Sequence, residues 1–468
     1  SIISPFNFAE TALWYTMLLR SHPPRELEEG FFMSYWKSRQ TLTCMEKPPV
    51  NLTVITRLRA YTRRYPSQFW LLFWGTLVST TGMSMIWPFL ALYISAELSL
   101  PLTTVGSLLS IRALMSLISS FLAGEVTDRI GRKWAMVASL AVNGAAFLLM
   151  IQADTYLQFA LLLALRGVFQ PLYRVGADAM LADLVPEEER ADAYALNRLS
   201  KNAGVALGPA LGGLVATSSY SITFSVAAGA TIFFSILIAM FAVETLPRKD
   251  PAAASSQHQG GFHVIFQDSV FLVFIFGFIL RQVSSSMLWT LLAAYAKQNY
   301  RLSESLYGLI PTTNALMVVF LQILVTRKTS RFPPLNVMAV GTLLYGLGVS
   351  SIALGNAFWG FWISMIIVTL GELMVIPTAS SYTAKRAPED MRGRYMSVLA
   401  LTWGAGSMVG PLLGGFLNDQ ISPISIWYGG GAAGVLGALI FLLLILRIGP
   451  PIIAQENSIT IQIAQDEN

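Results

Sequence analysis

The chain has 468 residues, of which 54% are hydrophobic and only 12% are charged. A soluble domain carries about 25% charged residues, so this composition excludes an ordinary soluble protein and indicates a chain that lies in a lipid bilayer. Its net charge of +5 follows from how basic residues are distributed between loops, and we expect no nucleic-acid partner.

Residues 1–44 differ from the rest of the chain. Their best apolar patch, 6–19, contains Glu10 and is too short to span a bilayer, which takes about 20 apolar residues per helix. The basic start and small-residue cleavage site of a signal peptide are not clear. We expect 1–44 to be an atypical extension, either disordered or an artefact of start-site assignment, followed by a cytoplasmic flank at 45–68.

From residue 69 onward, apolar stretches of spanning length recur, and they predict an all-α membrane protein with 12 transmembrane helices. The predicted helices cover 69–94, 102–123, 134–153, 156–180, 195–217, 220–243, 270–296, 305–326, 335–354, 358–382, 396–417 and 424–446.

Basic residues set the predicted orientation. Lys and Arg gather in the flank before the first helix, in the even-numbered loops and after the last helix, whereas only Lys297 and Arg301 fall in odd-numbered loops. Because basic loops stay on the cytoplasmic side, both termini should face the cytoplasm. We therefore expect a multi-pass protein of the cell (plasma or inner) membrane.

The chain also repeats itself at an offset of 202 residues. The repeat predicts two pseudo-symmetric six-helix bundles, at 69–243 and 269–446. A cytoplasmic linker at 244–268 joins them, and a cytoplasmic tail at 447–468 comes after the second bundle. Duplicated halves in a membrane chain usually enclose a site at their interface and rock about it.

Predicted helices 2 and 3 are joined by the string GEVTDRIGRK at residues 124–133. Its glycines permit a tight reversal, and its charges can pair with each other or with helix ends. This GxxxDRxGRK pattern resembles the signature loop of the major facilitator superfamily, the twelve-helix secondary transporters, and the resemblance extends over about 69–446. A cytoplasmic turn whose charges only set the topology is the alternative.

In that family the loop's aspartate lies against the start of helix 11 and bonds with its arginine, which latches the halves while the transporter is open outward. The resemblance implies these roles for Asp128 and Arg129, with Asp183 as a third partner. In the second half, Ser330 stands where the aspartate would be, so a symmetric second latch is not expected. The expected gating loop consists of Gly124, Asp128, Arg129, Gly131, Arg132 and Asp183.

Glycines and a proline recur in predicted helices 5 and 11. Small residues four apart let two helix backbones approach closely, and proline bends a helix. The string in helix 5 resembles the GxxxGPxxGG signature of family members that exchange drugs for protons. Its repetition in helix 11 leaves a packing role shared by the two halves as the alternative. The motif residues are Gly204, Gly208, Pro209, Gly212, Gly213, Gly406, Gly410, Pro411, Gly414 and Gly415.

Two charged residues deep within predicted helices are candidates for proton coupling, because charges inside a membrane are costly and default to functional sites. Glu372 is the carboxylate placed deep in a span, and Arg166 resembles an arginine of helix 4 that recurs in proton-coupled members. The proton affinity of such a carboxylate depends on whether its surroundings are wet, closed or occupied. A permanent ion pair of Glu372 with Arg166 or Arg281 is the alternative.

The resemblance also implies a central cavity lined by helices 1, 4, 7 and 10. We expect Gln170, Arg281, Arg112 and Trp289 to contact substrate there, and Gln170 should face Glu372 because the repeat places them at equivalent depths. The surplus of arginine favours an anionic or amphiphilic substrate, and aromatic side chains supply an apolar wall. For Trp289, lipid-facing packing or an interfacial anchor is the alternative.

These features predict a secondary active transporter that exports small amphiphilic or drug-like molecules in exchange for protons, as in the 12-helix drug:proton antiporter group that it resembles. The alternatives are a proton-coupled organic-anion transporter and, in a different class, a membrane receptor or scaffold that transports nothing. One cysteine, Cys44, and three histidines outside the spans suggest no metal site, and no catalytic set is recognisable. We expect a monomer in the lipid bilayer whose partners are a small-molecule substrate and protons, with no cofactor and no enzymatic activity.

Overall fold

The structure is a computed structural model, which describes residues 65–246, 263–388 and 391–448. The chain divides into two compact units, Ser1–Tyr65 and Pro66–Asn468, and the second contains the described helices. The predictions for 1–44, and for most of the flank, linker and tail, fall outside the described residues.

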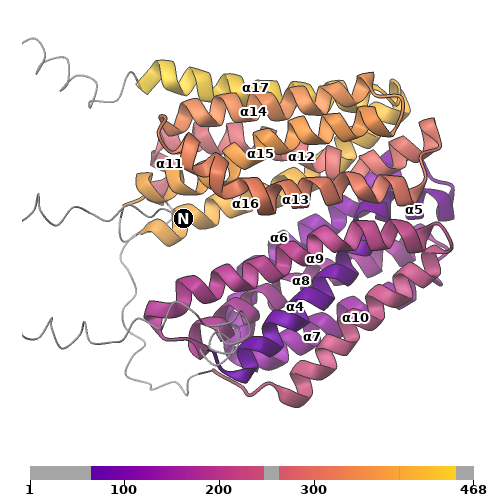
Figure 1. Cartoon of the computed structure of the whole chain (residues 1–468), viewed down its shortest axis with the longest axis vertical. Coiled ribbons are helices and arrows are strands. Elements are labelled where there is room, and N and C mark those ends of the chain that lie inside the picture. The colour runs from indigo at the N-terminus through magenta and orange to yellow at the C-terminus, as the bar shows by residue number, and fades with distance from the viewer. Residues whose placement is uncertain (1–64, 247–262, 389–390, 449–468) are drawn as a thin grey trace, which may run out of the picture. The chain divides into compact units, whose positions relative to one another are not determined.

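The described helices form a first half from α4 to α10 and a second half from α12 to α17 (Figure 1). The first half consists of α4 (Ser67–Ile86), η1 (Trp87–Phe89), α5 (Leu90–Leu98), α6 (Leu102–Ile130), α7 (Arg132–Met150), α8 (Tyr156–Leu184), η2 (Glu187–Glu189), α9 (Arg190–Ala216) and α10 (Tyr220–Phe241). After the short α11 (His263–Gln267), the second half consists of α12 (Ser269–Tyr300), α13 (Glu304–Thr329), α14 (Pro334–Ser351), η4 (Ile352–Leu354), α15 (Phe358–Arg386), α16 (Arg392–Gln420) and α17 (Ser425–Ile448).

Ten helical segments within the described residues are long and apolar enough to cross a membrane, with α4, η1 and α5 counted as one. The helices α8 and α9 are not among them, although they have 29 and 27 residues. Both carry charges within the helix, including Arg166 and Arg174 in α8 and Arg198 and Lys201 in α9, and these lower the mean hydropathy. The all-α membrane fold is confirmed, and the count of twelve spans stays a prediction.

Helix ends follow from local sequence. Thr155 and Gln158 form a capping box at the start of α8, which satisfies backbone N–H groups that lack helical partners. The predicted end of helix 2 at residue 123 is wrong, because α6 continues to Ile130. The polar residues after 123 end the apolar signal without breaking the helix. Gly131, whose φ of 94° suits glycine, then makes the turn into α7.

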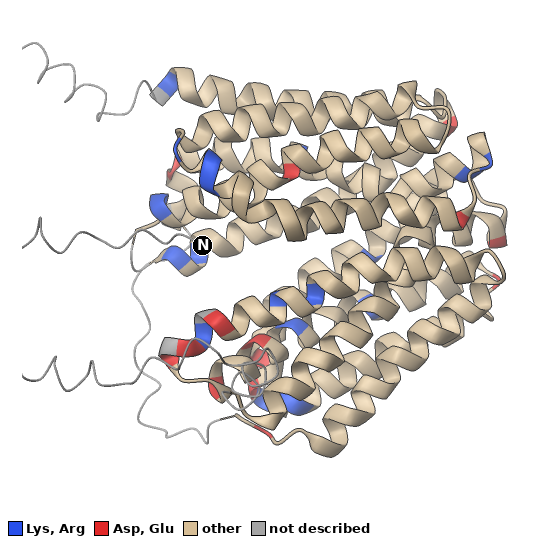
Figure 2. Cartoon of the chain, in the orientation of Figure 1, with Lys and Arg blue, Asp and Glu red and all other residues tan. Residues whose placement is uncertain are grey.

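Charged residues gather near the ends of the helices, and few lie within them (Figure 2). We call the end at which α10 ends and α12 begins the linker end and the opposite end the far end. Near the far end, Tyr93 packs against Phe224 with ring centroids 4.6 Å apart. The repeat-equivalent Tyr295 packs against Trp427 at 5.0 Å. The two tyrosines therefore occupy matching positions in the cores of the two halves.

The halves meet through two matching helix pairs, α6 with α16 and α13 with α9. A Cβ atom at Gly106 would lie 2.4 Å from the carbonyl oxygen of Pro411, and one at the repeat-equivalent Gly308 would lie 2.3 Å from that of Pro209. Such spacing excludes any side chain and brings the backbones into direct contact. The 202-residue register seen in the sequence is therefore reproduced in the contacts that join the halves.

The glycine motifs of α9 and α16 pack within their own halves as well. Gly204, Gly208 and Gly212 lie against the backbone or Cβ atoms of α4, and Gly406 and Gly410 lie in the same way against α12. Gly213 and Gly415 face the other half, where added Cβ atoms would lie 2.2 Å from Glu304 O and 2.4 Å from Leu102 O. These contacts support the packing interpretation of the motif in both copies.

Two carboxylates of the second half join the halves at the far end. Asp419 on α16 accepts hydrogen bonds from the backbone N–H of Thr103 at 2.7 Å and from its hydroxyl at 2.6 Å. Glu304 at the start of α13 accepts one from the Tyr220 hydroxyl at 3.0 Å. Together with the glycine contacts, these bonds join the halves in the far-end part of the helices.

Candidate functional site

A pocket lies between the two halves, enclosed by η1, α5 and α6 of the first half and by α12 and α16 of the second. Its volume is about 180 Å³, which is below the roughly 300–1,000 Å³ of pockets that bury a drug-sized ligand and suits a small molecule. It is lined by Trp87, Leu90, Ala91, Leu109, Arg112, Gln282, Ser285, Ser286, Trp289, Thr290, Trp403, Ser407 and Pro411.

Aromatic rings form the apolar part of this pocket. The repeat-equivalent Trp87 and Trp289 lie with ring centroids 5.7 Å apart at an interplanar angle of 37°, one from each half. Trp403 on α16 also lines the pocket and is 48% exposed. The structure thus places Trp289 at the pocket and brings its counterpart from the other half beside it.

Arg112 lines the pocket directly, and Gln170 stands behind it. The Nη1 of Arg112 donates to Gln170 Oε1 at 3.1 Å. Gln170 is the central residue of α8 and does not itself line the pocket. Two of the four predicted cavity residues, Arg112 and Trp289, therefore line the pocket, and Gln170 reaches it through Arg112.

Glu372 makes the equivalent contact in the second half. It is half-buried at the centre of α15, and its Oε2 accepts a hydrogen bond at 2.9 Å from the Asn314 amide, which also donates to Thr369 at 3.0 Å. Asn314 and Glu372 follow Arg112 and Gln170 by one repeat. The described contacts pair each member with its own half, and the expectation that Gln170 faces Glu372 at equivalent depth stays a prediction.

Arg166 is buried in α8, away from the pocket lining. Its Nε donates to Asn143 Oδ1 at 3.2 Å, and its guanidinium carbon lies 3.8 Å from the centre of the Phe147 ring. Both partners are on α7, so the charge is held by an amide and by a cation–π contact. Among the described residues, Arg166 forms no ion pair with Glu372.

Arg281 is fully buried on α12, behind the pocket wall. Its Nη1 donates to Gln282, and its guanidinium carbon lies 4.1 Å from the centre of the Tyr345 ring. Its Nε and Nη2 atoms have no hydrogen-bond partner among the described residues. Arg281 therefore lies behind Gln282, which lines the pocket, and does not line the cavity that it was expected to contact.

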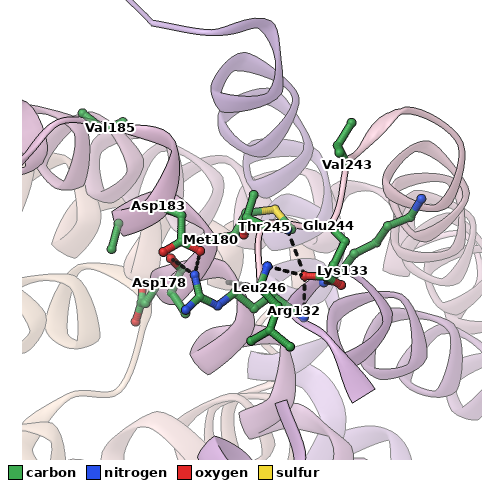
Figure 3. Close-up of polar contacts among 12 residues, drawn as sticks. Arg132, Lys133, Asp178, Met180, Asp183, Val185, Val243, Glu244, Thr245 and Leu246 are labelled. Carbon is green, nitrogen blue, oxygen red and sulfur yellow. Dashed lines mark hydrogen bonds and ion pairs between the residues drawn. The ribbon is translucent and has the colours of Figure 1, made fainter. Parts of the chain in front are cut away.

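The gating string lies at the linker end, with its polar contacts inside the first half (Figure 3). Arg132 pairs with Asp183, and the backbone N–H groups of Arg132 and Lys133 donate to Glu244 at 3.0 and 3.1 Å. Glu244 thus caps α7 and fixes the chain that enters the linker. The sequence interpretation missed this carboxylate, although its position directly after α10 was a signal that it lies near the loop.

The remaining loop residues are at the surface. Arg129 pairs with Glu125 one turn earlier on α6, with side-chain exposures of 74% and 59%. Asp128 is exposed and makes no ion pair within the described ranges, and Gly124 has no atom within 4 Å of an added Cβ. The expected bond between Asp128 and helix 11 is not among the described contacts, and that role stays a prediction.

In the second half, Asp268 joins three helices at the linker end. Arg386 donates to its two oxygens at 2.8 and 2.6 Å, Tyr395 donates at 3.3 Å, and the Phe271 N–H donates at 3.0 Å. Burial alone would raise the pKa of Asp268, but the bonds from Arg386, the α12 backbone and Tyr395 together hold it below its usual value. Asp268 was also missed, because its partners are distant in sequence.

Known proteins resemble this chain in sequence over most of its length. A family model described as Major Facilitator Superfamily matches residues 72–283 and 274–461. A curated relative from Planococcus maritimus, named Na(+), Li(+), K(+)/H(+) antiporter, is 28% identical over 388 residues, which cover 76% of this chain and 89% of the relative. The quinolone resistance protein NorA of Staphylococcus aureus (strain MSSA476) is 22% identical over 377 residues, covering 80% and 96%.

Solved structures share the fold. The nucleoside transporter NupG has a TM-score of 0.68 at 14% identity and covers 81% of this chain and 99% of its own. A bacterial homolog of the human lysosomal transporter Spinster, in an inward-facing and unoccupied conformation, has a TM-score of 0.66 at 14% identity, with coverages of 81% and 95%. The family model spans both halves and more than half of the chain. The chain therefore belongs to the major facilitator superfamily.

Proposed function

We propose that this protein exports small amphiphilic or drug-like molecules across the cell membrane in exchange for protons. Its family and its antiporter and efflux relatives support secondary transport. The pocket between the halves supports a small-molecule substrate, which would contact Arg112 and the tryptophans directly. The proposal assigns the protein no catalytic activity and places its linker end in the cytoplasm, as the basic loops favour.

The observation that carries proton coupling is the position of Glu372. It is a half-buried carboxylate at the centre of a spanning helix, and a neutral amide is its described hydrogen-bond partner. A carboxylate without a counter-cation is costly to keep charged away from water. In the proposed exchange, Glu372 would therefore be the group that carries the proton.

Alternating access would follow from how the halves meet. The described contacts between them lie toward the far end, so this arrangement supports a state that is closed there. Asp128 and Arg129, which contact no residue of the other half among the described contacts, would form the linker-end latch in the opposite state. Arg166 would tune the proton affinity of the interior through its charge, without contacting Glu372.

The test replaces Glu372 by Gln in proteoliposomes with an imposed pH gradient. The amide preserves shape and removes the titratable group, so transport driven by the gradient should be abolished while the protein remains folded. Glu97→Gln, the same exchange at an exposed far-end position, is the matched control and should transport normally. Unchanged gradient-driven transport in Glu372→Gln would remove this residue from the mechanism.

Arg112 in the pocket favours a second candidate, proton-coupled transport of an organic anion. The direction of proton movement that substrate induces separates it from export by exchange, because symport moves protons with the substrate and exchange moves them against it. A membrane receptor without transport is the remaining alternative, and it would show binding without flux.

A further inference from the structure

The polar wall of the pocket is backed by a buried arginine. Gln282 and Ser285, on consecutive turns of α12, both line the pocket, and Arg281 lies behind them with no exposed surface. A guanidinium group can only donate hydrogen bonds. A side chain that accepts a hydrogen bond from Arg281 must therefore turn its acceptor toward Arg281 and its donors away from it.

The hydrogen bond from Arg281 orients the side-chain amide of Gln282. Because Arg281 Nη1 donates to the side-chain oxygen of Gln282, the amide NH₂ must occupy the other position. Gln282 lines the pocket, and this nitrogen has no hydrogen-bond partner among the described contacts, so it can donate to a ligand there. Close packing fixes the backbone, since a Cβ at Gly406 would lie 2.6 Å from Gln282 Cβ.

Ser285 is oriented through Tyr345. Arg281 lies over the Tyr345 ring, and the Tyr345 hydroxyl donates to Ser285 Oγ at 2.9 Å. Since the serine oxygen already accepts from the tyrosine, its own hydrogen is free to donate elsewhere. The wall therefore presents two donors, an amide oriented by Arg281 and a hydroxyl oriented by Tyr345.

The rest of the pocket has the same polarity. Arg112 contributes a guanidinium from the first half, of which one nitrogen is held by Gln170. The described lining includes no Asp or Glu. Trp87, Trp289 and Trp403 supply flat apolar surfaces beside these donors.

We propose that this pocket is a hydrogen-bond-donor site for an aromatic ligand that bears a carboxylate or carbonyl group, and that Arg281 is the positioning residue that sets its polarity. The aromatic body lies against the tryptophans, and its acceptor meets Gln282, Ser285 and Arg112. The statement that this ligand is a transported substrate rests on the proposed function. The polarity of the pocket itself is independent of transport.

Calorimetric titration of the purified protein in detergent tests this with two probes that share a ring and differ in head group, naphthylacetate and naphthylethylamine. The acid should bind at least about tenfold more tightly, the scale expected for hydrogen bonds to a charged group. Gln282→Leu should weaken the acid about tenfold and leave the amine unchanged. Arg281→Met should reduce the preference although Gln282 remains, because the amide can then turn its oxygen toward the ligand.

Gln322→Leu makes the same exchange on α13, outside the pocket lining, and should leave both affinities unchanged. If Arg281→Met does not fold, Gln282→Leu alone decides the outcome. Equal affinities or preference for the amine in the unmodified protein would overturn the proposal, as would equal losses for both probes in the variants. Selective binding of the acid without flux in proteoliposomes would support the donor site while rejecting the transport function.

Discussion

The two halves place a hydrogen-bonded pair at the same position and divide the charge differently. In the first half, Arg112 on α6 donates to Gln170 on α8, and in the second, Asn314 on α13 donates to Glu372 on α15. A cation with a neutral amide in one copy thus becomes a neutral amide with a carboxylate in the other. Gln170 and Glu372 are both the central residues of their helices.

The comparison shows that the two halves keep the same backbone contacts and differ in side-chain charge. A Cβ added at Gly106 would lie 2.4 Å from the Pro411 oxygen, and one added at Gly308 would lie 2.3 Å from the Pro209 oxygen. The two backbone contacts are therefore closely matched, because packing at an interface tolerates little change. The side chains that pair α6 with α8, and α13 with α15, carry different charges in the two halves. The resulting asymmetry gives one half a carboxylate and the other a cation, which under the proposed function are the proton-binding group and the substrate-facing cation.

The strongest way to break this comparison is to exchange the two central residues. In the double variant Gln170→Glu with Glu372→Gln, the carboxylate moves to the first half, beside Arg112. We expect gradient-driven transport in proteoliposomes to stay at the level of protein-free vesicles, because the arginine stabilises the charged carboxylate and opposes protonation. Recovery of coupled transport would show that either half can carry the proton.

A second test asks whether the matched backbone contacts matter equally. Gly106→Leu and Gly308→Leu should each destabilise the protein by about 1–3 kcal/mol or more, since the added side chain meets backbone atoms that cannot move aside. Thermal unfolding in detergent measures this. Gly229→Ala on α10, where no atom lies within 4 Å of the new Cβ, serves as the control and should not lower the unfolding temperature. Markedly different losses for Gly106 and Gly308 would argue against symmetric interfaces.

At the linker end, the second half has a carboxylate, Asp268, whose contribution to stability should depend on pH. Asp268→Asn keeps a good N-cap for α12 but removes the charge that Arg386 binds through both oxygens. It should destabilise the second half at neutral pH by about 1 kcal/mol, the upper end of the scale for partly exposed ion pairs. Because the pKa of Asp268 is held below its usual value, its stabilising contribution is complete above about pH 4 and is lost as pH falls through the lowered pKa. The difference in unfolding temperature between the two proteins should therefore shrink in acid; a constant difference would contradict this account.

The smallest effect should come from the exposed pair on the gating string. Glu125→Gln removes the partner of Arg129, and surface ion pairs contribute only a few tenths of a kcal/mol. The unfolding temperature should change by less than the error of the measurement. Arg132→Gln, which loses the less exposed Asp183 as a partner, should lower it measurably. Equal effects of the two variants would place Arg129 and Arg132 in similar surroundings.

Sequence reasoning predicted most of the fold because apolar stretches and a gap-free repeat are local or periodic signals. It also placed Arg112 and Trp289 at the pocket, since charged and aromatic residues deep in a span stand out. It missed Asn314, which is an ordinary amide on its own, although the repeat pairs it with Arg112. Gln282 and Ser285 were missed because their role depends on which face of α12 meets the other half, and that is set by tertiary packing.

The far end of the molecule shows a division between donors and acceptors. Thr103 and Tyr220 of the first half donate to Asp419 and Glu304 of the second. To part the halves on that side, water must replace bonds at two carboxylates that both travel with the second half. Separation on that side would therefore leave two carboxylates on the second half and only uncharged donors on the first.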